Sequence, residues 1–154
     1  MADGTVLETI TLEEAQQVVD AAAKKAAEIG QPMDIAVVDA GGNLNAHARM
    51  DGANTGSVTI AINKAYTSIA FQCETGGLQE ATRPHGPIHG LSDAHGGRLV
   101  VFPGGIPLVR DGRIMGAIGG VHRDHRAGPG GRRGRGLGLL KRLGARLQRR
   151  FNQA

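Results

Sequence analysis

Three short apolar runs follow one another near the end of the chain, and the breaks between them constrain the fold more than any other feature. They occupy residues 98–102, 106–110 and 113–118. Only Asp111-Gly112 separates the last two, and this dipeptide accepts the positive φ angles of a two-residue β-turn. Pro-Gly-Gly separates the first two. The runs therefore predict a three-stranded antiparallel meander.

Helix signals and a hairpin signal precede the meander. Thr11 and Glu14 form a capping box, and apolar residues at helical spacing continue to Ile29, where Gly30 ends the helix. Residues 33–38 and 44–50 flank the turn-forming residues 39–43, which predicts an antiparallel hairpin.

Residues 56–71 carry an apolar helical stripe. Residues 76–97 are rich in Gly, Pro and His and predict mainly loop, with one helical turn near 78–81. The order of elements predicts a single α+β domain, a five-stranded antiparallel sheet flanked by helices.

Charge is divided sharply along the chain. Residues 1–119 contain 8 Lys and Arg against 13 Asp and Glu, whereas residues 120–154 contain 10 against 1. The basic isoelectric point therefore comes from the last segment alone. The body has one Tyr, no Trp and a net negative charge, so it is a poor candidate for specific nucleic-acid binding.

Two further features indicate the cellular compartment of the protein. The single cysteine, Cys73, excludes a disulfide within the chain, and the start lacks the pattern of a signal peptide. No apolar run approaches the roughly 20 residues that span a bilayer. We therefore expect a cytoplasmic protein without a membrane span, in which Cys73 is a small buried apolar residue.

Several stretches together resemble the GlcG/HbpS family of haem-binding or haem-degrading domains, which also form the C-terminal part of PduO-type proteins. They are the capping box at 11–15, AVVDAGGNL (36–44), ARMDGA (48–53), KAYTSIAF (64–71), GPIHG (86–90) and GGIPLVRDGRIMGAIG (104–119). The resemblance implies a five-stranded antiparallel sheet with profilin- or PAS-like layering, assembly into homodimers and octamers, and haem as a cofactor.

The segment after Gly119 departs from this family, whose members continue with an acidic closing helix. When residues 119–136 are back-translated with G/C-rich codons, deleting one G from the opening run of G changes the encoded sequence to GVSTGTTEQDQAVAEAG, which is the expected ending. We therefore interpret 1–119 as the family domain and 120–154 as a frameshifted basic tail. Residues 120–136 are expected to be disordered, and Leu140, Leu143 and Leu147 predict an amphipathic helix over 138–151. Sequencing the source gene tests this.

Cationic side chains near the ARMDGA motif are the first candidate ligand-binding residues. Arg49 and Asp51 stand where a strand is expected to enter a loop, and a guanidinium there can bind a haem propionate. The alternative is a surface salt bridge between the two. Lys64, on the following helix, is expected to face the same pocket. The alternative is that Lys64 is exposed to solvent on its helix and has no role in binding.

Histidines in the glycine-rich loop are candidate axial ligands for haem iron. His85 and His89 are four residues apart, and His95 follows. Their loop is not helical, so the spacing does not suit zinc, and we expect no separate metal site. His47, on a predicted strand, is expected to be structural or exposed, and Asp39 to stabilise the hairpin turn rather than act as a catalytic acid.

These observations favour a haem-binding or haem-handling protein whose ligand lies near a subunit interface, between the loops at 49–53 and 86–97. The alternative is an enzyme or accessory factor acting on a small 2-hydroxy or 2-oxo acid, whose carboxylate Arg49 would hold. The residues leave catalysis itself open.

Overall fold

The computed structural model describes residues 8–122 of the chain. Most of the basic tail, including the predicted helix at 138–151, lies outside the described residues. The elements are α1 (Leu12–Glu28), β1 (Met33–Asp39), β2 (Leu44–Arg49), α2 (Ser57–Phe71), the 3₁₀ helices η1 (Thr75–Leu78) and η2 (Leu91–Asp93), α3 (Ala94–Gly97), β3 (Gly105–Arg110) and β4 (Arg113–His122).

The strands form one antiparallel sheet in the order β2-β1-β4-β3. The predicted α+β class and antiparallel sheet are confirmed. The predicted strand count is wrong, because the sheet within residues 8–122 has four strands rather than five. Both predicted hairpins are present, as β1–β2 and β3–β4.

The segment expected to be the fifth strand, residues 98–102, instead packs against helices. The Val100 N–H donates to Thr67 Oγ1 of α2 at 2.9 Å, and Thr75 Oγ1 of η1 donates to the Phe102 carbonyl at 2.8 Å. Leu99 and Val100 are buried. Side chains of neighbouring helices thus satisfy backbone groups that would otherwise pair with a strand.

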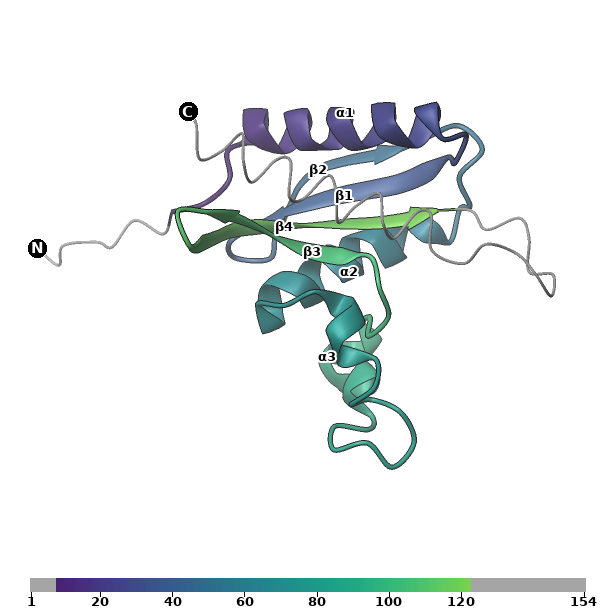
Figure 1. The fold of residues 1–154 in the computed structure, drawn as a ribbon, viewed down its shortest axis with the longest axis vertical. Helices are drawn as coiled ribbons and strands as arrows, with labels where there is room; N and C mark the ends of the chain where they lie inside the picture. Colours follow the sequence, from purple (N-terminus) through teal and green to yellow (C-terminus); the bar gives the residue numbers. More distant parts are fainter. Residues whose placement is uncertain (1–7, 123–154) are drawn as a thin grey trace, which may run out of the picture.

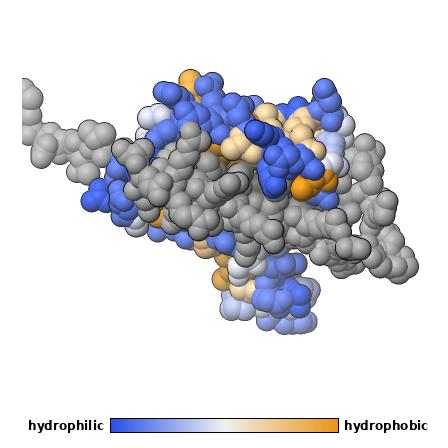
Figure 2. Space-filling model, turned by 45° about the horizontal axis from the view of Figure 1, so that its top comes forward, coloured by the Kyte–Doolittle hydropathy of each residue, from blue (hydrophilic) through white to orange (hydrophobic). Residues whose placement is uncertain are grey.

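The helices cover the two faces of the sheet (Figure 1). Helix α1 packs on β1 and β2, whereas α2 packs on the opposite face, against β4, β1 and β3. Residues Met33 to Val38 of β1 are therefore buried throughout, with alternate side chains in the two cores. The outward side of α1 is mainly polar, as the upper part of Figure 2 shows.

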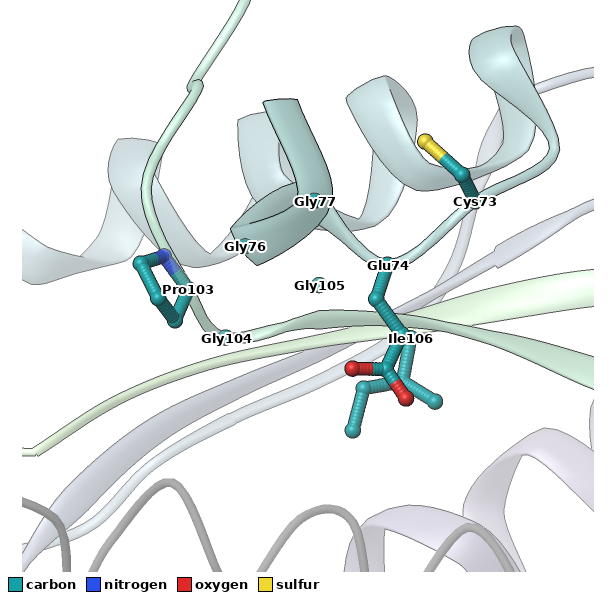
Figure 3. A pocket seen from close by; sticks show the side chains of 8 residues that line it. All are labelled: Cys73, Glu74, Gly76, Gly77, Pro103, Gly104, Gly105 and Ile106. Atoms are coloured by element: carbon teal, nitrogen blue, oxygen red, sulfur yellow. The ribbon is translucent and has the colours of Figure 1, made fainter. Parts of the chain in front are cut away.

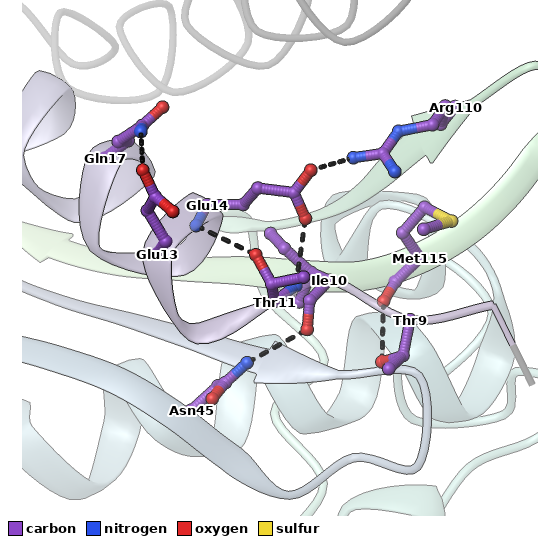
Figure 4. Close-up of polar contacts among 9 residues, drawn as sticks. All are labelled: Thr9, Ile10, Thr11, Glu13, Glu14, Gln17, Asn45, Arg110 and Met115. Atoms are coloured by element: carbon purple, nitrogen blue, oxygen red, sulfur yellow. Dashed lines mark hydrogen bonds and ion pairs between the residues drawn. The ribbon is translucent and has the colours of Figure 1, made fainter.

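Contacts at both ends of α1 fix its position. The Glu14 N–H donates to Thr11 Oγ1 at 3.2 Å while the Thr11 N–H donates to Glu14 Oε2, as the capping box predicts. Glu14 also pairs with Arg110 of β3 (Figure 4). At the other end, Gly30 has a φ of 65° and closes the helix.

The turns follow the predicted chemistry. Asp39 Oδ1 accepts hydrogen bonds from the N–H groups of Gly41 and Asn43, at 2.9 and 2.8 Å. The Asp39 carboxylate therefore stabilises the β1–β2 turn, as expected. Asp111 and Gly112 have φ angles of 48° and 77°, as a type I′ turn between β3 and β4 requires.

Helix α2 lies so close to the sheet that two facing positions must be glycine. A Cβ at Gly119 would clash with the Ala61 carbonyl, and one at Gly105 with the Lys64 carbonyl. Both clashes are with helix backbone, which cannot move aside without separating α2 from β3 and β4.

Strand β4 continues three residues past the boundary expected at Gly119. Gly120 and Val121 pair with Ile35 and Asp34 of β1, so the predicted disorder is wrong for residues 120–122. None of the helices within residues 8–122 is long and apolar enough to cross a bilayer.

Candidate functional site

Arg49 is exposed at the end of β2, where the chain turns towards α2. Its Nη2 donates to the Ala53 carbonyl at 3.0 Å. The turn itself is closed by the Ala53 N–H, which donates to the Met50 carbonyl. Asp51 is exposed in this turn, and the ion pairs among the described residues include no Arg49–Asp51 pair. The guanidinium is thus held by backbone at a surface where an anion can reach it.

A buried carboxylate lies directly across from Arg49. Asp34 of β1 faces Arg49 in the register, and its side chain is fully buried. His47 shares this face, with its Nε2 at 3.5 Å from Asp34 Oδ1, which is an ion-pair distance without hydrogen-bond geometry. Burial raises the pKa of Asp34, and the charges of His47 and Arg49 oppose the shift.

Our sequence analysis missed Asp34. The available signal was an acidic residue within the otherwise apolar run at 33–38, a position where burial on both faces is expected. His47, expected to be structural or exposed, is partly buried, with a side chain 22% exposed.

Lys64 is buried between α2 and the sheet rather than solvated. Only 5% of its surface is exposed. Its Nζ donates to the Gly120 carbonyl at 3.2 Å and lies 4.6 Å from the centre of the Phe102 ring. Burial lowers the pKa of this amine to about 8.

Arg49 and Lys64 lie next to different strands of the sheet. Arg49 belongs to β2, whereas Lys64 contacts β4 and the segment before β3, so the central strand β1 lies between them. That both cations face one pocket remains a prediction. One is an exposed guanidinium, and the other is an enclosed amine.

A pocket of about 580 Å³ opens beside the segment that encloses Lys64 (Figure 3). The four glycines of its lining and Pro103 belong to two segments that meet there, η1 and the stretch that leads into β3. Thr75 of η1 joins these segments, because its Oγ1 accepts a hydrogen bond from the Gly105 N–H at 2.9 Å. The side chain of Glu74 extends towards β3 in Figure 3. The residues lining the pocket are Cys73, Glu74, Gly76, Gly77, Pro103, Gly104, Gly105 and Ile106.

Cys73, expected to be a buried apolar residue, is only partly buried at this pocket. Burial and the nearby Glu74 carboxylate both raise the pKa of its thiol. The thiolate, which is the reactive form, is therefore disfavoured.

His85 and His89 are exposed in the segment between η1 and η2, which projects away from the layers in Figure 1. His85 has a φ of 69°. His95 differs, because its Nδ1 is hydrogen-bonded to the Tyr66 hydroxyl at 3.0 Å. Within one chain, the projecting segment is separate from the turn that carries Arg49 and Asp51. Residues 8–122 contain no group of three or more His, Cys, Asp or Glu positioned to hold a metal ion.

Comparison with known proteins supports the fold and the family. GlcG of Escherichia coli K12 is 31% identical over 105 residues, covering 68% of this chain and 75% of GlcG. A 15.0 kDa Citrobacter freundii protein encoded between dhaT and dhaS is 39% identical over 111 residues, or 72% of this chain and 78% of its own.

Solved structures share the whole arrangement. Protein ORFY of Klebsiella pneumoniae superposes with a TM-score of 0.81 at 29% identity, covering 98% of this chain and 96% of ORFY. The PduOC–haem complex superposes with a TM-score of 0.75 at 24% identity, covering 92% of this chain and 94% of its own, and shows a shared fold. The model of the HbpS-like haem-degrading proteins matches residues 10–123, so the chain belongs to the HbpS-like family.

Proposed function

We propose that this protein binds and handles haem as a cytoplasmic homo-oligomer. The observation that carries the proposal is the match to the HbpS-like haem-degrading family over residues 10–123. A haem-bound structure of the same fold, the PduOC–haem complex, supports it. Bound haem would supply an iron whose reactivity depends on its axial ligand.

Arg49 is the residue best placed to hold a propionate. Its guanidinium is exposed, and the 3.0 Å hydrogen bond to the Ala53 carbonyl fixes its direction. A guanidinium forms paired, charge-assisted hydrogen bonds with a carboxylate, which a lysine ammonium cannot reproduce in the same geometry. The exposed carboxylate of Asp51 would lower the net positive charge of the same turn. Lys64 is enclosed, so in this proposal it supplies positive charge beneath the sheet rather than direct contact.

His85 and His89 are the candidate axial ligands, because both imidazoles are exposed. Their segment projects away from the layers that carry Arg49 (Figure 1). We therefore propose that the site forms between two copies of the chain, with the propionate held by Arg49 of one copy and the iron by a histidine of the other.

Titration with haemin tests the function. We expect a shifted Soret band and saturation at a defined ratio of haem to protein; an unchanged spectrum would refute haem binding. Arg49→Ala should weaken binding at least tenfold and Arg49→Lys should restore it only partly. Arg83→Ala is the matched control, since Arg83 is exposed in the projecting segment and pairs only with the neighbouring Glu80 among the described contacts.

Mixing of variants tests the two-copy site. Arg49→Ala and His85→Ala/His89→Ala proteins are each expected to bind haem weakly. After co-refolding, mixed oligomers should regain sites that combine an intact Arg49 with intact histidines. Size-exclusion chromatography with light scattering checks that oligomers form. Haem binding without any recovery in mixed oligomers would leave the function standing and refute the shared site.

A further inference from the structure

Arg98 forms none of the ion pairs described within residues 8–122, unlike most arginines of the domain. Three others pair with glutamates: Arg83 with Glu80, Arg110 with Glu14 and Arg113 with Glu8. The Arg98 guanidinium instead lies over the ring of Tyr66, with its Cζ 3.5 Å from the ring centre. A guanidinium stacked on an aromatic ring keeps the N–H groups along its edge available for hydrogen bonds.

Tyr66 holds this guanidinium in a fixed position. The Tyr66 ring packs against the β1–β2 turn, since a Cβ at Gly42 would lie 3.0 Å from Tyr66 Cδ2. The Tyr66 hydroxyl is hydrogen-bonded to His95 Nδ1 at 3.0 Å. Because the turn and His95 both constrain the ring, the ring in turn orients the Arg98 side chain.

The contact with Tyr66 leaves the second ring nitrogen of His95 available. His95 is exposed, and the hydrogen bonds described within residues 8–122 include none to its Nε2. When the Tyr66 hydroxyl donates to Nδ1, the neutral imidazole carries its proton on Nε2. A protonated imidazole carries a proton on both nitrogens. In both cases the Nε2–H group is a free donor close to Arg98.

The backbone around His95 adopts a conformation that favours glycine. His95 has a φ of 52° and a ψ of 34°, and Gly96 and Gly97 follow with φ angles of 68° and 78°. Left-handed residues other than glycine are costly, and they cluster at ligand-binding and active sites. A Cβ at Gly96 or Gly97 would meet nothing within 4 Å, so the segment that joins His95 to Arg98 borders open space.

We propose that Arg98 and His95 bind the oxyanion group of a small molecule, either a carboxylate or a phosphate monoester. Both side chains offer N–H donors, which match a group that only accepts hydrogen bonds. The edge of the guanidinium binds two oxygens, and His95 Nε2–H supplies a further hydrogen bond. Tyr66 is the positioning residue. This site uses neither Arg49 nor the exposed histidines of the haem proposal, and it stands or falls independently of that proposal.

NMR titration tests the site. Full-length, ¹⁵N-labelled protein is titrated at constant ionic strength with methyl phosphate and, separately, with sodium acetate. We expect saturable shifts in the backbone amides of Gly96 and Gly97 and in the Nε–H group of Arg98. The anion that saturates these shifts at the lower concentration identifies the class of ligand.

Removal of the guanidinium should have the largest effect. Arg98→Gln should weaken binding about tenfold or more, because it removes the charged donors. Arg83→Gln is the matched control, since Arg83 is exposed and pairs with Glu80, and it should leave binding unchanged. The basic segment after residue 122 is intact in both variants, so it cannot account for a difference between them. Melting curves check that both variants fold.

Two further variants separate the roles of the other side chains. His95→Asn removes the imidazole donor while asparagine tolerates the left-handed conformation, so binding should weaken without loss of the fold. Tyr66→Leu should weaken binding by removing the surface on which Arg98 stacks. Tyr66→Phe should restore most of it, because the ring remains.

Three results would overturn the proposal. The absence of a saturable shift at Gly96, Gly97 and Arg98 with either anion would remove the site. Equal weakening by Arg98→Gln and Arg83→Gln would show a general effect of charge rather than a site. Unchanged binding in His95→Asn would show that the imidazole takes no part.

Discussion

Two cationic side chains on either side of β1 show how position within the layers decides chemistry. Arg49 lies at an exposed strand end and is held by one backbone carbonyl. Lys64 lies beneath the sheet, where burial lowers its pKa to about 8. The first is suited to binding an anion as a permanent charge, whereas the second is suited to losing its proton. Two cationic side chains thus meet two different environments within one small domain.

The largest expected effect comes from adding a side chain at Gly105, where β3 packs closely against the backbone of α2. Gly105→Ala places a Cβ against the Lys64 carbonyl and should lower the free energy of unfolding by about 3 kcal/mol or more. Gly77→Ala is the matched control, because it lines the same pocket without a close neighbour. Urea titration of both variants measures the difference. Equal stability of the two would contradict the close packing of α2 on β3.

The next largest effect is a pH dependence of stability that distinguishes the buried amine of Lys64 from the amine of an exposed lysine. The pKa of Lys64 lies below its ordinary 10.5, so between about pH 8 and 10.5 the unfolded chain binds more protons than the folded one. The contribution of Lys64 to stability therefore rises with pH, by up to about 3 kcal/mol.

Lys64→Met should be more stable than the parent protein at pH 7, and the difference should shrink towards pH 10.5. Thermal unfolding of both proteins across this range checks the prediction. A difference that does not depend on pH would show that the amine is not desolvated.

A smaller effect is expected at Asp34, on the Arg49 side of the sheet. Burial raises its pKa above 3.8, so the ionised carboxylate destabilises the fold at neutral pH. Asp34→Asn should raise the free energy of unfolding by about 1 to 2 kcal/mol at pH 7. This gain should disappear below pH 3.8, where the carboxyl is protonated in both states. Loss of stability at pH 7 would show that the pairing with His47 outweighs burial.

Arg49 itself should matter least for stability. Its side chain is exposed, so Arg49→Ala should change the free energy of unfolding by no more than about 0.5 kcal/mol. Circular dichroism melting curves measured alongside the haemin titration would show this. A large loss of stability would mean that Arg49 supports the turn rather than a ligand.

Local chemistry made much of the fold predictable. Thr11 with Glu14, and Asp111 with Gly112, specify a helix start and a turn through contacts between residues close in sequence. The segment at 98–102 shows where such reasoning fails. Its apolar pattern suits a strand, yet Thr67 and Thr75 satisfy its backbone from other elements, and no local signal records those contacts.

The site was less predictable, because burial depends on which elements meet. Arg49 is exposed at the end of a strand, as its position before a loop suggested. The burial of Lys64 requires knowledge that α2 lies against Gly105 and Gly119. The pair Asp34 and His47 likewise depends on the register of β1 against β2. The roles proposed for Arg49, Lys64, His85 and His89 remain predictions.

The position of β4 in the sheet has a consequence for synthesis. β4 is the last strand among residues 8–122, yet it lies between β1 and β3, next to a strand made some 80 residues earlier. A nascent chain can form the β1–β2 hairpin early. The other hydrogen-bonding edge of β1 stays incompletely paired until β4 has been synthesised through His122. A change of reading frame before Arg113 would replace β4, one of the two central strands, whereas one after His122 leaves all four strands encoded.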